Sequence, residues 1–280
     1  ANAGFENKAG FNNSFFGAYA GQNNVTGANN SFFGVFSGSA TTSGSDNSFF
    51  GHRSGLANSS GALNSFFGTF SGTFNTTGSD NSFFGNSTGY NSNGDRNSFF
   101  GSQAGYQNSA GSDNSFLGSF AGRANTTGSN NAFVGSSAGS LNATGINNSF
   151  FGSNAGFTNT ASGNSFFGRD SGFFNNTGAN NSFFGHAAGR TNTVGELNVF
   201  VGNNAGMSNT IGNSNTIVGA EANVFSGNLS YATAIGAEAV VSTSNTVVLG
   251  RPADSVRIPG SLNVTGGLNV SGTLTAANLS

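Results

Sequence analysis

The chain has 280 residues, including 46 glycines and 31 phenylalanines, and a formal net charge of −2 at pH 7. Only 6% of its residues are charged, and the lysines and arginines are scattered, so we expect neither nucleic acid nor anionic lipid as a partner. No apolar run reaches the roughly 18 residues of a membrane-spanning helix, so we expect no membrane insertion by this chain. Glycine is too abundant for a helical protein, and phenylalanine is too abundant for a disordered one. Both facts favour a protein built from an internal repeat.

A pentapeptide block, Asn-Ser-Phe-Phe-Gly, recurs along most of the chain, and its closing glycines are 17 residues apart, with two steps of 16. They are Gly17, Gly34, Gly51, Gly68, Gly85, Gly101, Gly118, Gly135, Gly152, Gly168, Gly185, Gly202, Gly219 and Gly236. A unit of this length is too short for a pair of helices and predicts one coil of an all-β parallel solenoid, with two strands of about four or five residues. We expect about 14–15 coils over residues 1–250, stacked at about 4.8 Å into a rod of roughly 65 Å.

Each block carries two adjacent phenylalanines. The first five pairs are Phe15-Phe16, Phe32-Phe33, Phe49-Phe50, Phe66-Phe67 and Phe83-Phe84. Neighbouring strand residues face opposite sides, so one ring of each pair enters the coil and the other points outward. The second position also accepts Leu117, Val134 and Val201, so we assign it to the interior. The first position, which is Phe in twelve successive coils, is then assigned to the outside.

An outward column of phenylalanines would be a large apolar surface. At about 100 Å² for each ring it would expose on the order of 1,200 Å², whereas the largest apolar patch on a monomer is about 300–600 Å². We therefore predict that this column is buried between chains. A closed three-fold bundle is the most economical symmetry for parallel rods, so the expected partner is the chain itself, as a homotrimer.

An asparagine precedes each Ser-Phe-Phe block, beginning with Asn13, Asn30, Asn47, Asn64 and Asn81. Stacked coils place these side chains directly above one another. We expect an amide ladder in which each side chain bonds the next and thereby fixes the register between coils.

Other polar residues are interpreted as structural. His52 and His186 occupy equivalent coil positions but lie eight coils apart, too far to share a metal ion within one chain. Asp46, Asp80 and Asp113 each precede a block and are interpreted as turn formers, because the Gly-Asp nonapeptide of calcium-binding solenoids is absent. We expect no catalytic, cofactor or metal site, since a repeat rod places like side chains beside like rather than converging unlike groups in a pocket.

Glycosylation sequons recur in the turns. They include Asn24, Asn75, Asn125 and Asn142, and Asn- and Thr-rich turns generate such motifs by chance. Glycosylation at these positions would require a host that performs it.

The 17-residue repeat pattern of the sequence ends near residue 250. The segment Asn245-Thr246-Val247-Val248-Leu249-Gly250 reads as a last aliphatic coil, and Arg251-Pro252 interrupts the repeat. In residues 251–280 apolar and polar residues alternate and glycines recur, which predicts short strands joined by turns. A segment this short cannot form a core alone, so we expect a shaft of three intertwined copies.

The blocks Thr233-Ala234-Ile235-Gly236 and 245–250 resemble the left-handed parallel β-roll repeats in the heads of trimeric autotransporter adhesins. The stretch 256–266 is similar to segments of bacterial and phage tail-fibre proteins that lead into a shaft. The resemblance implies a left-handed coil, a trimer, and an extracellular or cell-surface location or a place in a phage-like tail fibre.

These features lead us to expect a fibrous attachment protein, not an enzyme, with a cell-surface or glycan ligand. The alternative is a structural subunit that polymerises end to end, because terminal coils are open sheet edges and the chain starts within the repeat pattern at Asn2-Ala3-Gly4. Ice binding is disfavoured, since threonine pairs such as Thr76-Thr77 occur in too few coils to form a lattice.

Overall fold

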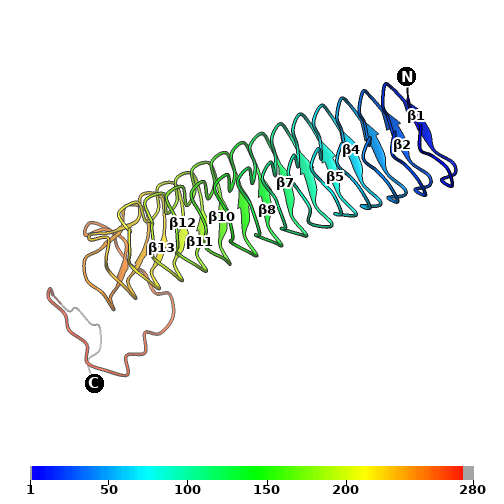
Figure 1. Ribbon diagram of the computed structural model, residues 1–280. Coiled ribbons are helices and arrows are strands. Elements are labelled where there is room, and N and C mark those ends of the chain that lie inside the picture. Colours follow the sequence, from blue (N-terminus) through cyan, green and yellow to red (C-terminus); the bar gives the residue numbers. More distant parts are fainter. Residues whose placement is uncertain (1, 274–280) are drawn as a thin grey trace.

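The computed structural model, which describes residues 2–273, is a rod of stacked coils (Figure 1). The main sheet has fifteen parallel strands in the order β1 to β13, β15 and β17, and a small second sheet pairs β14 with β16. The strands are β1 (Ser14–Phe16), β2 (Ser31–Phe33), β3 (Ser48–Phe50), β4 (Ser65–Phe67), β5 (Ser82–Phe84), β6 (Ser98–Phe100), β7 (Ser115–Leu117), β8 (Ala132–Val134), β9 (Ser149–Phe151), β10 (Ser165–Phe167), β11 (Ser182–Phe184), β12 (Val199–Val201), β13 (Thr216–Val218), β14 (Asn223–Val224), β15 (Thr233–Ile235), β16 (Val240–Val241) and β17 (Val247–Leu249). The all-β parallel solenoid of about fourteen 17-residue turns is thus confirmed.

The register between coils has no shift: the first, second and third residues of each strand pair with the first, second and third residues of the next. The expectation of two strands in every coil was wrong, because most coils contain a single three-residue strand. Outside the strands the coils still exchange backbone hydrogen bonds, such as Gly55 N to Ser71 O at 2.9 Å and Ala57 N to Thr73 O at 2.9 Å. Left-handed residues in each coil bend this part of the backbone away from extended geometry.

The core is a column formed by the first phenylalanine of each pair, so the sequence-based assignment of the two rings was reversed. Phe32, Phe49 and every following first ring up to Phe200 are buried, and successive centroids lie 4.7–4.9 Å apart with nearly parallel planes. Glycine faces each ring from across the coil: a Cβ atom on Gly55 would lie 2.4 Å from the ring of Phe49. A coil this narrow leaves room for only one ring.

The asparagine column before the strands bonds to backbone rather than mainly to neighbouring side chains, which corrects the expected amide ladder. Asn30 Nδ2 donates to Gly44 O at 2.9 Å, and Asn30 Oδ1 accepts from the backbone N–H of Asn47 at 3.0 Å. The same two bonds recur at Asn47 and Asn64. Each buried side chain therefore fastens two backbone groups of the next coil, which holds the register as expected although by different bonds.

A second buried asparagine column, which the sequence analysis missed as a structural feature, does form an amide ladder. Asn125 Nδ2 donates to Asn108 Oδ1 at 2.6 Å, and Asn142 Nδ2 donates to Asn125 Oδ1 at 3.1 Å. The sequon residues Asn24, Asn75, Asn125 and Asn142 all belong to this column and are fully buried. The folded solenoid has no room for a glycan at any of these four positions, so they are core residues and not modification sites.

The repeat ends at β17, where Arg251 bonds Glu238 at 3.1 Å and Asp254 at 3.2 Å. Residues 251–273 contain no strand and are exposed, including the apolar side chains of Leu262 and Leu268. The strands expected here were not found in the single chain, because a segment of this length has no apolar surface of its own to pack against. Residues 274–280 of the expected shaft lie outside the described residues.

Candidate functional site: the outward stripe

The second phenylalanine of each pair forms an exposed apolar column on the strand face of the rod. We call this column the outward stripe; its members are Phe16, Phe33, Phe50, Phe67, Phe84, Phe100, Leu117, Val134, Phe151, Phe167, Phe184, Val201, Val218, Ile235 and Leu249. Phe33 and Phe100 keep 38% and 40% of their surface exposed. The stripe was predicted from the sequence, but with the wrong ring of each pair.

Aromatic stacking runs along the stripe in two separate sections. The rings from Phe33 to Phe100 stack with centroids 4.7–4.9 Å apart, and those from Phe151 to Phe184 stack at 4.8–5.0 Å. Between the sections, Leu117 and Val134 leave an apolar hollow of about 490 Å³ that Phe100 and Phe151 border. Side-chain size therefore varies along the stripe, whereas the chemistry stays apolar.

The stripe is large for the surface of a single chain. If the nine phenylalanines each expose about 80 Å², and the smaller aliphatic side chains add to them, the stripe presents on the order of 1,000 Å². A monomer seldom exposes a contiguous apolar patch beyond about 600 Å². None of the residues of the fifteen-stranded sheet is charged, so contact of these strands with another apolar surface would bury no charge.

Other aromatic residues line an edge of the rod beside the stripe, and the sequence analysis did not single them out. Tyr19 and Phe36 stack at 4.9 Å, and the guanidinium of Arg53 lies 6.0 Å from the ring of Phe36 and 5.9 Å from that of Phe70. Their regular 17-residue spacing, Tyr19-Phe36-Arg53-Phe70, was the signal that marked them as a column. Arginine between two rings gains cation–π attraction and covers apolar surface.

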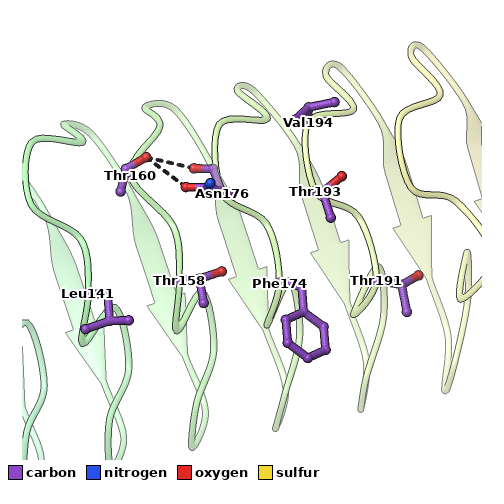
Figure 2. A pocket seen from close by; sticks show the side chains of 8 residues that line it. All are labelled: Leu141, Thr158, Thr160, Phe174, Asn176, Thr191, Thr193 and Val194. Atoms are coloured by element: carbon purple, nitrogen blue, oxygen red, sulfur yellow. Dashed lines mark hydrogen bonds between the residues drawn. The ribbon is translucent and has the colours of Figure 1, made fainter.

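A second hollow, of about 550 Å³, lies among turn residues and contains no strand residue (Figure 2). One row of its lining holds Leu141, Thr158, Phe174 and Thr191, and the other holds Thr160, Asn176, Thr193 and Val194. All eight side chains are uncharged. This hollow combines an aromatic ring with a row of hydroxyl and amide groups, a composition that differs from the wholly apolar stripe.

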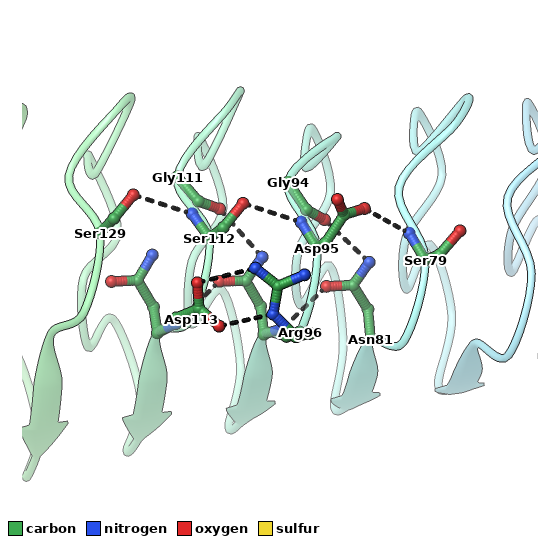
Figure 3. Close-up of polar contacts among 11 residues, drawn as sticks. Ser79, Asn81, Gly94, Asp95, Arg96, Gly111, Ser112, Asp113 and Ser129 are labelled. Carbon is green, nitrogen blue, oxygen red and sulfur yellow. Dashed lines mark hydrogen bonds and ion pairs between the residues drawn. The ribbon is translucent and has the colours of Figure 1, made fainter.

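Asp46, Asp80 and Asp113 lie in the turns before strands; Figure 3 shows Asp113 together with Asp95. Asp46, Asp80 and Asp113 have left-handed φ values of 58–60°, which asparagine and aspartate tolerate better than most residues, in agreement with their interpretation as turn formers. Asp113 accepts hydrogen bonds from Arg96 Nε at 2.7 Å and Nη2 at 3.0 Å. These bonds lower the pKa of the Asp113 carboxyl, although an exposed ion pair of this kind contributes little to stability.

The two histidines are far apart and pack locally. His52 contacts the ring of Phe70 edge-on at 5.3 Å, and His186 Nδ1 lies 3.5 Å from Asn203 Nδ2. Within residues 2–273 no group of three or more His, Cys, Asp and Glu side chains is placed to hold a metal ion. The same part of the chain has no helix with the length and apolarity needed to cross a bilayer.

Comparison with known proteins adds no relative. No protein-family model matches the chain, and no curated protein matches it in sequence. The architecture that the structure shows is a parallel β-solenoid with repeats of about 17 residues.

Proposed function

We propose that this chain is an extracellular fibrous attachment protein whose rods associate as homotrimers along the outward stripe. The observation that carries the proposal is the uncharged apolar stripe that runs along the whole fifteen-stranded sheet. Its exposed area is comparable to the roughly 800 Å² that each partner buries in a typical stable interface. The side chains of the stripe are spaced by one coil along a straight rod. A second copy of the rod has the same spacing, so it can place one apolar side chain against each coil.

The side chains of the stripe become smaller toward the C-terminal end. From Val201 onward the stripe holds Val218, Ile235 and Leu249 in place of phenylalanine. Smaller side chains let neighbouring rods approach more closely there, just before residues 251–273. The exposed apolar residues of that segment, such as Leu262 and Leu268, would then be covered by intertwining three copies into a shaft.

The role in attachment rests on the resemblance of the last coils to adhesin heads. β15 and β17, each followed by a glycine, carry the Thr-Ala-Ile-Gly and Val-Val-Leu-Gly blocks. A head of stacked coils followed by a shaft displays a long, rigid surface at a distance from its anchor. The sparsely charged exterior rich in asparagine, serine and threonine suits a surface that meets neutral ligands.

Sedimentation equilibrium of the full chain tests the trimer. We expect three times the chain mass for the wild type and a shift to the single-chain mass for the double variant Phe33→Ser with Phe100→Ser. The matched control is Phe74→Ser with Phe120→Ser, because these rings are exposed to a similar degree, 43% and 38%, but lie outside the stripe. A monomeric wild type, or equal dissociation of both variants, would refute the proposal.

Electron microscopy of the same material separates the attachment fibre from the end-to-end filament. Discrete rods agree with the attachment fibre, and filaments of indefinite length would replace it with the structural subunit. Binding of the rods to cell surfaces tests the attachment role itself, and rods that bind none of a panel of bacterial and animal cells would contradict that role.

A further inference from the structure

We infer that the hollow around Phe174 is a binding site for a neutral, unbranched oligosaccharide of about three sugar residues. The inference deepens the proposed attachment role and rests on it. It concerns a part of the rod that the outward stripe does not include. The argument depends on where the hollow lies, how its polar groups are held, and what its lining lacks.

The hollow lies on the side of the coil opposite the strands. Gly172 and Gly189 face the inward rings of Phe166 and Phe183 from across the coil, and Phe174 follows Gly172 by two residues. Association of rods through the strand face therefore leaves the hollow open to solvent. A ligand site on this side is compatible with the proposed trimer.

The hollow arises from two local departures from the repeat. The coil that begins at Gly152 has 16 residues instead of 17, so the turn after Thr160 is shorter than its neighbours. In the same coil Thr158 stands between the larger side chains of Leu141 and Phe174 (Figure 2). A short turn and a small side chain in one coil recess the surface of an otherwise regular rod.

The polar groups of the hollow are fixed before any ligand arrives. Thr158 Oγ1 donates to Phe173 O at 2.9 Å, and Thr160 Oγ1 donates to Asn176 O at 3.0 Å. Thr193 Oγ1 likewise donates to Thr210 O at 2.9 Å. Each hydroxyl proton is thus committed to the next coil, and the oxygen lone pairs remain as acceptors. Because these side chains are already held, binding would cost little side-chain entropy.

Asn176 adds the complementary donor. Its Oδ1 lies 3.3 Å from Thr160 Oγ1, whose single proton is shared between this oxygen and Asn176 O. Because Asn176 is exposed and its Oδ1 faces Thr160, its Nδ2 can donate to a ligand. The hollow therefore offers acceptors at successive coils and a donor among them. A chain of sugar residues, each carrying hydroxyl groups that both donate and accept, matches such a row.

Phe174 supplies the apolar surface that sugars also require. Its ring is 42% exposed and is held by an edge contact with Phe173 at 4.7 Å and by the guanidinium of Arg190 at 5.1 Å. One face of a pyranose ring presents C–H groups that pack on an aromatic ring while its hydroxyls reach the polar row. Ligand sites commonly combine such an apolar lining with a few placed polar groups.

Size and charge narrow the class of ligand. The lining extends over four successive coils, from Leu141 to Thr193, and three coil steps of about 4.8 Å accommodate roughly three sugar residues in an extended chain. None of the eight lining residues is charged. The Arg190 guanidinium beside the hollow is engaged with the rings of Phe173 and Phe174. The lining itself therefore holds no charged group to pair with an acidic sugar, and it suits a neutral oligosaccharide.

Saturation-transfer difference NMR and calorimetry of the full chain with maltotriose, cellotriose and triacetylchitotriose test the inference. We expect at least one of these sugars to bind, and Phe174→Ala to weaken that binding about tenfold, as the loss of one aromatic contact predicts. The matched control is Phe74→Ala, since Phe74 occupies the same position in its coil and is equally exposed at 43%. Phe74→Ala should leave the affinity unchanged.

A second pair of variants tests the hydroxyl row without changing side-chain shape. Thr160→Val should weaken binding, whereas Thr126→Val, which removes an equivalent hydroxyl bonded to Ala143 O at 2.8 Å, should not. Circular dichroism checks that all four variants are folded. Absence of binding by all three sugars, or equal losses in a variant and its control, would overturn the inference. Because the trimer is measured by sedimentation, trimeric rods that bind no sugar would refute this site alone.

Discussion

Phe99 and Phe100 are adjacent in β6, yet Phe99 is fully buried whereas 40% of the surface of Phe100 is exposed. The ring of Phe99 is sandwiched between Phe83 at 4.9 Å and Phe116 at 4.7 Å. The ring of Phe100 stacks on Phe84 alone and borders the hollow above Leu117. The same residue type therefore has two positions in one strand: the first ring builds the chain's own core, and the second lies on the surface of the rod.

Replacing the inner ring should open the coil. Phe99→Ala leaves a cavity in a column that cannot collapse sideways, and we expect a loss of about 3–5 kcal/mol in the free energy of unfolding. Since each coil contacts only its neighbours, hydrogen exchange should accelerate at the amides of Ser98 and Ser115, which bond the next coil at 2.8 Å. Phe100→Ala is the control and should leave these amides protected. Equal exchange in both variants would contradict the assignment of the core.

The repeat length, the coil number and the parallel stacking were predictable, because the period of the Asn-Ser-Phe-Phe-Gly block directly counts the residues in one coil. Which ring of each pair points into the coil was not predicted correctly. Leu117 and Val134 at the second position led us to assign that position to the interior. The structure places them on the exposed side, where a smaller side chain leaves a surface hollow and not a buried cavity. The inner column stays Phe from Phe15 to Phe200 because every ring must stack on the next.

Strand number and polar ladders were harder to predict for a related reason. Backbone hydrogen bonds between coils continue through segments that left-handed residues such as Phe70 and Phe120 keep from being strands. Phenylalanine rarely adopts a positive φ, so the residue type did not predict this conformation. The hollow at Phe174 had a visible signal, the 16-residue coil that begins at Gly152, but its depth depends on how three neighbouring turns pack.

The buried asparagines should tolerate no charge. Asn114 Oδ1 accepts from Asn131 N at 3.0 Å, and Asn114 Nδ2 donates to Gly128 O at 2.9 Å. Asn114→Asp removes the donor and brings a carboxylate against a carbonyl, so we expect a loss of several kcal/mol, beyond the roughly 1–3 kcal/mol of one unsatisfied buried group. Urea unfolding measures this loss in the free energy of unfolding. The control Asn130→Asp changes an exposed residue of the adjoining turn and should alter stability by less than about 0.5 kcal/mol.

The glycine that closes each strand should resist substitution. Gly118 has a φ of +142°, and a Cβ atom there would lie 2.4 Å from the carbonyl oxygen of Gly135 in the next coil. Gly118→Ala therefore has to push two coils apart, and we expect a lowered thermal midpoint. Gly266→Ala, where a Cβ atom meets nothing within 4 Å, is the control and should melt like the wild type. Equal melting of the two variants would show that coil spacing does not depend on the glycine column.

The ion pair between Arg96 and Asp113 gives a prediction about pH. The hydrogen bonds from Arg96 lower the pKa of the Asp113 carboxyl below its usual range. A carboxyl whose pKa is lowered by folding contributes stability above its unfolded pKa, and this contribution is lost as the pH falls through the folded pKa. Carbon-detected NMR titration of Asp113 should therefore give a higher pKa in Arg96→Gln than in the wild type. Both side chains are exposed, so the thermal midpoint at neutral pH should change little. An unchanged Asp113 pKa in the variant would mean that the guanidinium does not hold this turn in solution.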